Sequence, residues 1–139
     1  MIQASIRDFP AGQSWNLSSL LMNQESRQVT IGRVNFGDDI ELGQGLSLFS
    51  LAGKTKQEQN KILDHLEKLF QVLRTHATIN YQNHGWNGEG FYISNNSRVP
   101  ILVGDEYLHL ENGKMALKGR TDLYFGLYGP VVFEAPKRA

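Results

Sequence analysis

Short apolar segments separated by glycines and polar turns fill the second half of the chain, and this pattern restricts the fold most. The segments are four to seven residues long, at 78–81, 90–94, 99–103, 106–110, 114–118, 121–127 and 131–134. This length and spacing are typical of β-strands. Because no helical pattern lies between them, nothing supplies the crossovers that parallel strands need. The pattern therefore predicts a mainly antiparallel sheet.

One long helix is predicted before this region, over about residues 56–76. Its apolar face is formed by residues at helical spacing, Ile62, Leu66, Leu69 and Leu73. Thr55 followed by Glu58 has the pattern of a capping box at the start of the helix. Asp64 and Lys68 have the spacing of an i,i+4 ion pair. So broad an apolar face favours packing of this helix across the sheet.

Two strands are predicted ahead of the helix, at 27–36 and 40–48. Val29 and Ile31 share one parity and Val34 and Phe36 the other, so a bulge at Gly32 would keep all four on the buried face. Turn residues at 37–39 then favour an antiparallel N-terminal β-hairpin. Together these elements predict an α+β fold with a single domain over residues 1–139. In it, a mainly antiparallel β-sheet packs against one long amphipathic helix.

The charges of the chain are balanced, with 14 basic and 14 acidic side chains and a net charge of zero at pH 7. Nucleic-acid-binding surfaces usually carry a strong positive excess, so no nucleic-acid partner is expected. The sequence has no cysteine, no apolar run long enough to span a membrane and no signal-peptide pattern. We therefore expect a cytoplasmic protein without disulfides and without a membrane partner.

The loop at 83–92 combines three glycines with amide, carboxylate, histidine and aromatic side chains. Glycines let backbone donors approach a ligand, and aromatic rings offer flat faces for a base, a sugar or a peptide. The predicted ligand-binding residues of this loop are His84, Trp86, Asn87, Glu89 and Tyr92. The alternative is a glycine-rich connection between strands, in which Trp86 and Phe91 fill the core.

The segment at 121–130 is rich in aromatic residues. In a strand, Tyr124 and Phe125 point to opposite faces of the sheet, so both cannot belong to one core. With Tyr128 they predict an interface for a protein partner or for a homo-oligomer. The alternative is a sheet that is covered on both faces.

No assembled catalytic motif is present. The serines lack a Gly-x-Ser-x-Gly elbow and the four histidines lack metal-ligand spacing, so no cofactor or metal is predicted. Gly53-Lys54-Thr55 is similar to the end of a P-loop, but Leu48 stands where the first glycine belongs, and Thr55 fits a helix N-cap. An enzyme would have to be a small hydrolase or lyase that uses His84 and Glu89 as acid and base.

From about Leu66, a predicted helix leads into Gly85-Trp86-Asn87-Gly88, followed by Tyr107-Leu108 and Thr121-Asp122-Leu123. In these motifs the chain resembles small phage and prophage proteins that sequester cyclic ADP-ribose-type signals and so defeat Thoeris immunity. It departs from them at Glu89, where they normally have lysine, and over 126–129, where they close on an acidic residue and tryptophan. About the first 55 residues have no counterpart. The resemblance implies an anti-defence protein that binds a nucleotide signal, and no site residue is transferred from it.

The leading hypothesis is a small non-catalytic binding domain. It recognises a protein partner or a small polar ligand through the Gly/aromatic loop at 83–92. Besides the hydrolase or lyase, two alternatives stay open: the phage-derived signal-binding protein and a structural subunit of a larger assembly.

Overall fold

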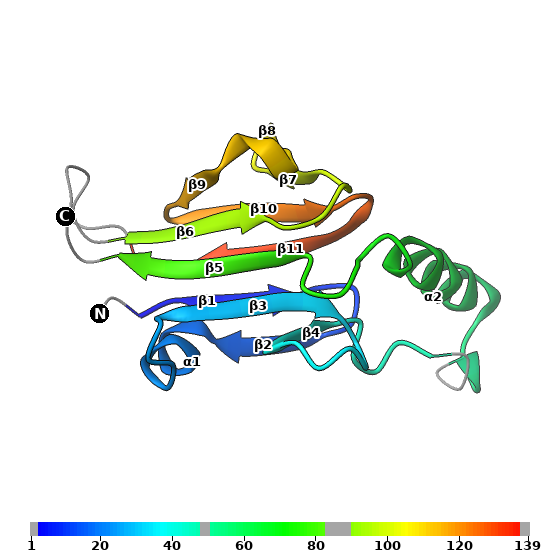
Figure 1. The fold of residues 1–139 in the computed structure, drawn as a ribbon. Coiled ribbons are helices and arrows are strands. Elements are labelled where there is room, and N and C mark those ends of the chain that lie inside the picture. The colour runs from blue at the N-terminus through cyan, green and yellow to red at the C-terminus, as the bar shows by residue number, and fades with distance from the viewer. Residues whose placement is uncertain (1–2, 48–50, 83–89, 137–139) are drawn as a thin grey trace.

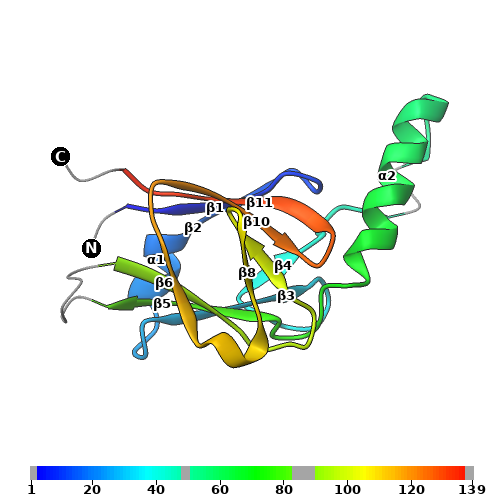
Figure 2. The same cartoon turned by 90° about the horizontal axis from the view of Figure 1, so that it is seen from above.

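Two β-sheets pack face to face as a β-sandwich, which Figure 1 shows from the side and Figure 2 from above. This computed structural model describes residues 3–47, 51–82 and 90–136. The first sheet, in the order β2–β1–β11–β10–β7–β8, contains β1 (Ser5–Asp8), β2 (Gln13–Asn16), β7 (Ile101–Val103), β8 (Glu106–Leu108), β10 (Arg120–Phe125) and β11 (Tyr128–Glu134). The second, in the order β4–β3–β5–β6–β9, contains β3 (Gln28–Arg33), β4 (Ile40–Leu42), β5 (Ala77–Gln82), β6 (Gly90–Asn95) and β9 (Lys114–Leu117).

The inner faces of the two sheets form one hydrophobic core. Buried and accessible residues alternate along β6, as expected for a strand with one face inward. The ring of Phe91 in the second sheet lies 5.4 Å from the ring of Phe133 in the first, so aromatic contact joins the sheets directly. Fully buried aliphatic residues belong to the same core, among them Ile6, Val29, Ile79, Ile93 and Leu123.

The prediction of one long helix packed on a sheet is wrong. The helix α2 (Lys56–Leu69) ends at its C-cap Phe70 and extends from one end of the sandwich, as Figure 1 and Figure 2 show. Leu63 is 42% exposed and Phe70 is 71% exposed. The apolar spacing continues beyond the helix because Val72, in the connection after it, is fully buried in the core. Since the two sheets cover each other, the α+β class is replaced by a β-sandwich with two short helices, α1 (Leu17–Met22) and α2.

The predicted N-terminal hairpin, formed by strands at 27–36 and 40–48, is also wrong. Strands β3 and β4 pair in parallel, with Ile31 opposite Ile40, so they do not form a hairpin. The antiparallel hairpin of this half is β1–β2, with Ile6 opposite Trp15. Alternating apolar residues specify which face of a strand is buried and say nothing about the direction of its neighbour, so this pairing could not be predicted.

The dipeptide Asn112-Gly113 is typical of a tight hairpin turn and predicts pairing of the strands around it, but it does not close a hairpin here. Strand β8 pairs with β7 in the first sheet, and β9 pairs with β6 in the second. Between them the chain changes sheet through the short 3-10 helix η2 (Leu110–Asn112), where the His109 amide donates to Asn112 Oδ1 at 3.0 Å. Strands β8 and β9 therefore each pair with a strand of their own sheet and not with each other.

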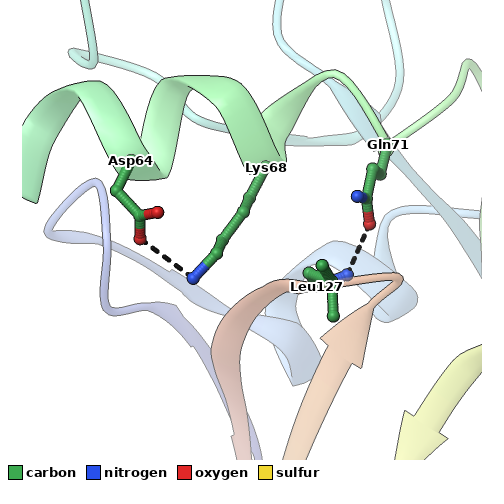
Figure 3. A network of polar contacts seen from close by, with 4 residues as sticks. All are labelled: Asp64, Lys68, Gln71 and Leu127. Carbon is green, nitrogen blue, oxygen red and sulfur yellow. Dashed lines mark hydrogen bonds and ion pairs between the residues drawn. The ribbon is translucent and has the colours of Figure 1, made fainter.

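Several local predictions are confirmed. Thr55 caps α2: its hydroxyl accepts from the Glu58 amide and donates to the Glu58 carboxylate. Lys68 Nζ lies 2.9 Å from Asp64 Oδ2, an ion pair drawn in Figure 3. In β10, Phe125 is fully buried while Tyr124 is partly exposed, so the two rings do point to opposite faces.

Among the described residues, no helix has the length and apolar character needed to cross a membrane.

Candidate functional site

Two connections, 34–39 and 70–76, bring two arginines and two phenylalanines together at the end of the sandwich that carries α2. The guanidinium carbon of Arg33 lies 4.7 Å from the ring centre of Phe36 and 5.2 Å from that of Phe70. The guanidinium carbon of Arg74 lies 5.3 Å from the ring centre of Phe36. One ring thus contacts both cations. We call Arg33, Phe36, Phe70 and Arg74 the arginine–phenylalanine cluster.

The end of α2 helps to position the cluster. Arg33 is the last residue of β3, and its Nη1 donates to the carbonyl of the C-cap Phe70 at 3.3 Å. A cation is favourable there because the helix C-terminus has unpaired carbonyls and a partial negative charge. Within the described residues, none of the ion pairs includes Arg33 or Arg74. Both guanidinium groups therefore have capacity to bind an external anion.

A carboxylate bridge beneath the cluster ties the two connections to each other. Asp38 Oδ2 accepts from the Thr75 amide at 2.9 Å, and Asp38 Oδ1 accepts from the Thr75 hydroxyl at 2.8 Å. Gly32 makes room for this bridge, because a Cβ at that position would collide with Asp38 Oδ2 and lie 2.9 Å from the Thr75 amide nitrogen. The bridge thus holds Arg74, next to Thr75, in place relative to β3.

His76 anchors the same end of the sandwich from inside the core. Its Nδ1 accepts from the Leu73 amide at 3.0 Å, so Nε2 carries the proton and donates to the Val99 carbonyl at 3.0 Å. Asn95 Nδ2 donates to the same carbonyl at 3.0 Å. His76 is fully buried, with the Phe125 ring edge-on to its imidazole. These contacts link the connection 70–76 to the connection between β6 and β7.

The burial of His76 makes the stability of the fold depend on pH. Burial lowers the pKa of His76 below its usual 6.5, although its hydrogen bond to the Val99 carbonyl opposes the shift. As the pH falls through 6.5, the unfolded chain therefore binds the proton first, and the free energy of unfolding decreases. Between about pH 7.5 and about pH 5.5 we expect a loss of about 1 kcal/mol, measured by urea denaturation.

The variant His76→Gln should remove most of this pH dependence. The matched control is His65→Gln, because burial also lowers the pKa of His65 but that residue is less buried than His76. A pH slope that survives in His76→Gln and disappears in His65→Gln would contradict the assignment.

A further contact fixes the exit of α2 to the first sheet. Gln71 Oε1 accepts from the Leu127 amide at 2.6 Å, as Figure 3 shows. Leu127 lies in the turn between β10 and β11. Gly126, before it, has no Cβ, and one built there would collide with Gln71 Oε1 and lie 3.0 Å from Val99. The connection 70–76 is thus held from both sheets.

Most of the predicted ligand-binding residues lie outside the described residues, namely His84, Trp86, Asn87 and Glu89. Of the five, the structure describes Tyr92, a partly exposed residue of β6 with Lys114 Nζ 5.1 Å from its ring centre. Gln82 and Gly90, which are described, pair with each other at the far end of β5 from Thr75. This pair and the arginine–phenylalanine cluster therefore lie at opposite ends of the sandwich.

The predicted interface residues separate into two environments. Phe125 and Tyr128 are fully buried and stabilise the core, so their rings are not available on the surface of this conformation. Tyr124 is partly exposed and packs beside Gly129, where a Cβ would lie 2.7 Å from its ring.

Sequence reasoning did not select any residue of the arginine–phenylalanine cluster. Arg33 and Phe36 were assigned to a strand, and Phe70 and Arg74 to the end of a longer helix. The available signal was the clustering of arginine and phenylalanine near the ends of apolar segments. Nothing in the sequence indicates that residues 37 or 38 positions apart meet in space.

The fold is similar to that of FHA domains. An FHA domain of an Arabidopsis thaliana hypothetical protein matches with a TM-score of 0.58 at 10% identity, over 100% of this chain and 88% of that one. A Synechocystis protein matches with a TM-score of 0.52 at 13% identity, over the full length of both chains. No protein-family model and no curated protein matches the sequence. The chain therefore has an FHA-like β-sandwich fold.

A third structure with this fold is the FHA domain of yeast Dun1, solved in complex with a doubly phosphorylated (pT) peptide derived from Rad53. It matches with a TM-score of 0.54 at 12% identity, over 100% of this chain and 78% of that one. The structural matches give no support to the resemblance to signal-sequestering phage proteins.

Proposed function

We propose that this chain is a non-catalytic protein-interaction domain that binds a phosphorylated segment of a partner protein. The observation that carries the proposal is the arginine–phenylalanine cluster, in which two guanidinium groups without a carboxylate partner among the described residues share one aromatic ring. The cluster is formed by connections at one end of an FHA-like sandwich, and binding residues commonly lie on such connections.

A phosphate suits this cluster better than a carboxylate does. Guanidinium groups bind phosphate through paired, charge-assisted hydrogen bonds, and a phosphorylated side chain has three strong acceptor oxygens and nearly two negative charges. Two arginines on one ring can divide these acceptors between them. Phe70, which is 71% exposed, offers apolar surface for the peptide beside the phosphate. The phosphopeptide in the yeast Dun1 complex supports the same ligand class for this chain.

Fluorescence anisotropy with a degenerate peptide library carrying one fixed phosphothreonine tests the proposal. We expect binding of the phosphorylated library and at least about tenfold weaker binding of the unphosphorylated one. Arg74→Ala and Arg33→Ala should each weaken binding by about tenfold or more, because each removes a charge-assisted contact to the phosphate. Arg33→Lys should recover only part of the loss, since lysine lacks the planar fork.

The control is Arg120→Ala, which removes an exposed arginine from β10 in the first sheet and should leave the affinity unchanged within about twofold. Arg33 also contacts the end of α2, so the thermal midpoint of each variant is measured alongside. Arg74 is exposed, and its replacement separates binding from stability. Equal binding of both libraries, or equal loss in Arg74→Ala and Arg120→Ala, would refute the proposal.

The Gly/aromatic loop at 83–92 is a second candidate surface for the same function. Tyr92, at its end, is partly exposed beside the Lys114 ammonium. If the loop is the binding surface, titration with the phosphopeptide library, followed by NMR, should shift the amides of residues 90–92 and leave those of Phe36 and Arg74 unchanged. The same spectra would report a small polar ligand or self-association.

A further inference from the structure

A groove of about 500 Å³ lies between α2, the turn after β1 and strand β11 of the first sheet. It shares no residue with the arginine–phenylalanine cluster. We call it the α2 groove, and its lining residues are Phe9, Pro10, Lys54, Glu58, Lys61, Ile62, His65 and Pro130.

The floor of the groove is apolar and held together by the backbone. Phe9 and Pro10 begin the turn between β1 and β2, and Pro130 lies in β11. The Phe9 amide donates to the Pro130 carbonyl at 3.2 Å, which joins this turn to β11. Phe9 is nevertheless 44% exposed, with the guanidinium carbon of Arg7 5.3 Å from its ring centre, so the floor presents a partly exposed aromatic ring with a cation beside it.

One face of α2 forms the wall. Glu58, Lys61, Ile62 and His65 lie three or four residues apart and therefore on the same side of the helix. The helix is fastened to the sandwich at its C-terminal end, where Leu69 packs over Gly43 and Gln71 accepts from the Leu127 amide. Its N-terminal turns project from the sandwich, as Figure 2 shows.

The rim of the groove is basic. Lys54 and Lys61 belong to none of the ion pairs formed within the described part of the chain. The Glu58 carboxylate already accepts from the Thr55 hydroxyl at the helix cap. His65 adds no charge at neutral pH, because burial lowers its pKa. The lining therefore combines two ammonium groups and one carboxylate, a net positive charge, with a partly exposed apolar floor.

We propose that the α2 groove binds an acidic segment of a partner protein that carries one large apolar side chain. That side chain lies between Phe9 and Ile62, where it is removed from water, and neighbouring carboxylates lie beside Lys54 and Lys61. The apolar floor disfavours a purely ionic ligand, and the zero net charge of the chain disfavours a nucleic acid. This surface is independent of the phosphopeptide site proposed above.

NMR of the isotope-labelled chain, titrated with the blocked peptide Glu-Asp-Glu-Phe-Glu-Asp, tests this proposal. We expect the amide resonances of Phe9, Ile62 and His65 to shift, and the shifts to saturate at millimolar peptide concentrations or below. The same peptide with serine for phenylalanine should bind at least about fivefold more weakly, and so should the peptide with amides for all its carboxylates. Lys61→Glu should weaken binding by about tenfold.

The matched control is Lys56→Glu, because Lys56 is exposed on the same helix but does not line the groove. Equal weakening by the two variants would refute the proposal, since it would reveal only a general effect of charge. The proposal would also be refuted if about 5 mM peptide caused no resonance shifts, or if the shifts were confined to Phe36 and Arg74.

Concentration-dependent dimerisation that is abolished by Phe9→Ser would show instead that a second copy of the chain fills the groove. Lys61→Glu should leave phosphopeptide binding unchanged, so the two proposals fail separately.

Discussion

Replacing Asp8 by alanine is expected to lower the free energy of unfolding by about 4 kcal/mol. Asp8 is fully buried at the end of β1. The Tyr128 hydroxyl donates to its two carboxylate oxygens at 2.7 and 2.9 Å, and the Gly43 amide donates to Oδ2 at 2.8 Å. Alanine would leave both donors buried without an acceptor, and each such donor costs about 1 to 3 kcal/mol.

A double-mutant cycle isolates this interaction. Tyr128→Phe alone should cost about 2 kcal/mol, because it removes the hydroxyl and leaves the carboxylate in a site where burial raises its pKa. The double variant should cost about 2 kcal/mol less than the sum of the single variants, since Tyr128 no longer needs an acceptor. Urea denaturation measures the free energy of unfolding of the two single variants and of the double variant.

The control for this cycle is Asp105→Ala. Asp105 is exposed in the turn between β7 and β8, so its loss should change stability by about 0.5 kcal/mol or less. Additive effects of Asp8→Ala and Tyr128→Phe would show that the two side chains stabilise the fold independently, against the proposed coupling.

Replacing Gly32 by alanine is expected to cost about 3 kcal/mol and to weaken phosphopeptide binding as well. A Cβ on Gly32 would collide with the Asp38 carboxylate and lie 2.9 Å from the Thr75 amide nitrogen. The Asp38 carboxylate can rotate away only by losing its hydrogen bonds to Thr75, and a shift of the Thr75 backbone breaks the same bridge. The variant should therefore lose both stability and phosphopeptide affinity. Urea denaturation measures the stability, and fluorescence anisotropy measures the affinity.

Gly90→Ala is the matched control for Gly32→Ala. Gly90 also lies in a strand of the second sheet, and the nearest atom to a Cβ there is 3.8 Å away on the Tyr92 ring. Alanine at Gly90 should change stability by about 1 kcal/mol at most and leave binding at the arginine–phenylalanine cluster intact. If Gly32→Ala behaves like Gly90→Ala, the bridge between Asp38 and Thr75 does not position the site.

Local features were predictable because their partners are close in sequence. The Thr55 cap and the ion pair of Asp64 with Lys68 each join residues three or four apart, and both are present. The extent of α2 was overestimated because Val72 continues the apolar spacing while it belongs to the sandwich core. A periodic pattern records which residues are buried and gives no information on what covers them.

The candidate site was less accessible to sequence reasoning than the fold. The loop at 83–92 attracts attention because its unusual residues are adjacent, whereas Arg33 and Phe70 come together only through tertiary structure. An arginine at a strand end or beyond a helix is ordinary by itself. It becomes a candidate for anion binding because residues distant in sequence lie next to it in the folded chain.

The residue pattern alone specified a strand-rich chain, the start of α2 and a chain without excess charge, because each depends on composition or on neighbours within a few positions. Tertiary packing decided that β3 and β4 run parallel, that β8 and β9 belong to different sheets, and that the sheets cover each other and leave α2 projecting. The physical reason is that hydrophobic burial has no direction. It determines which face of a strand turns inward, and the choice of partner depends on the packing of the whole chain.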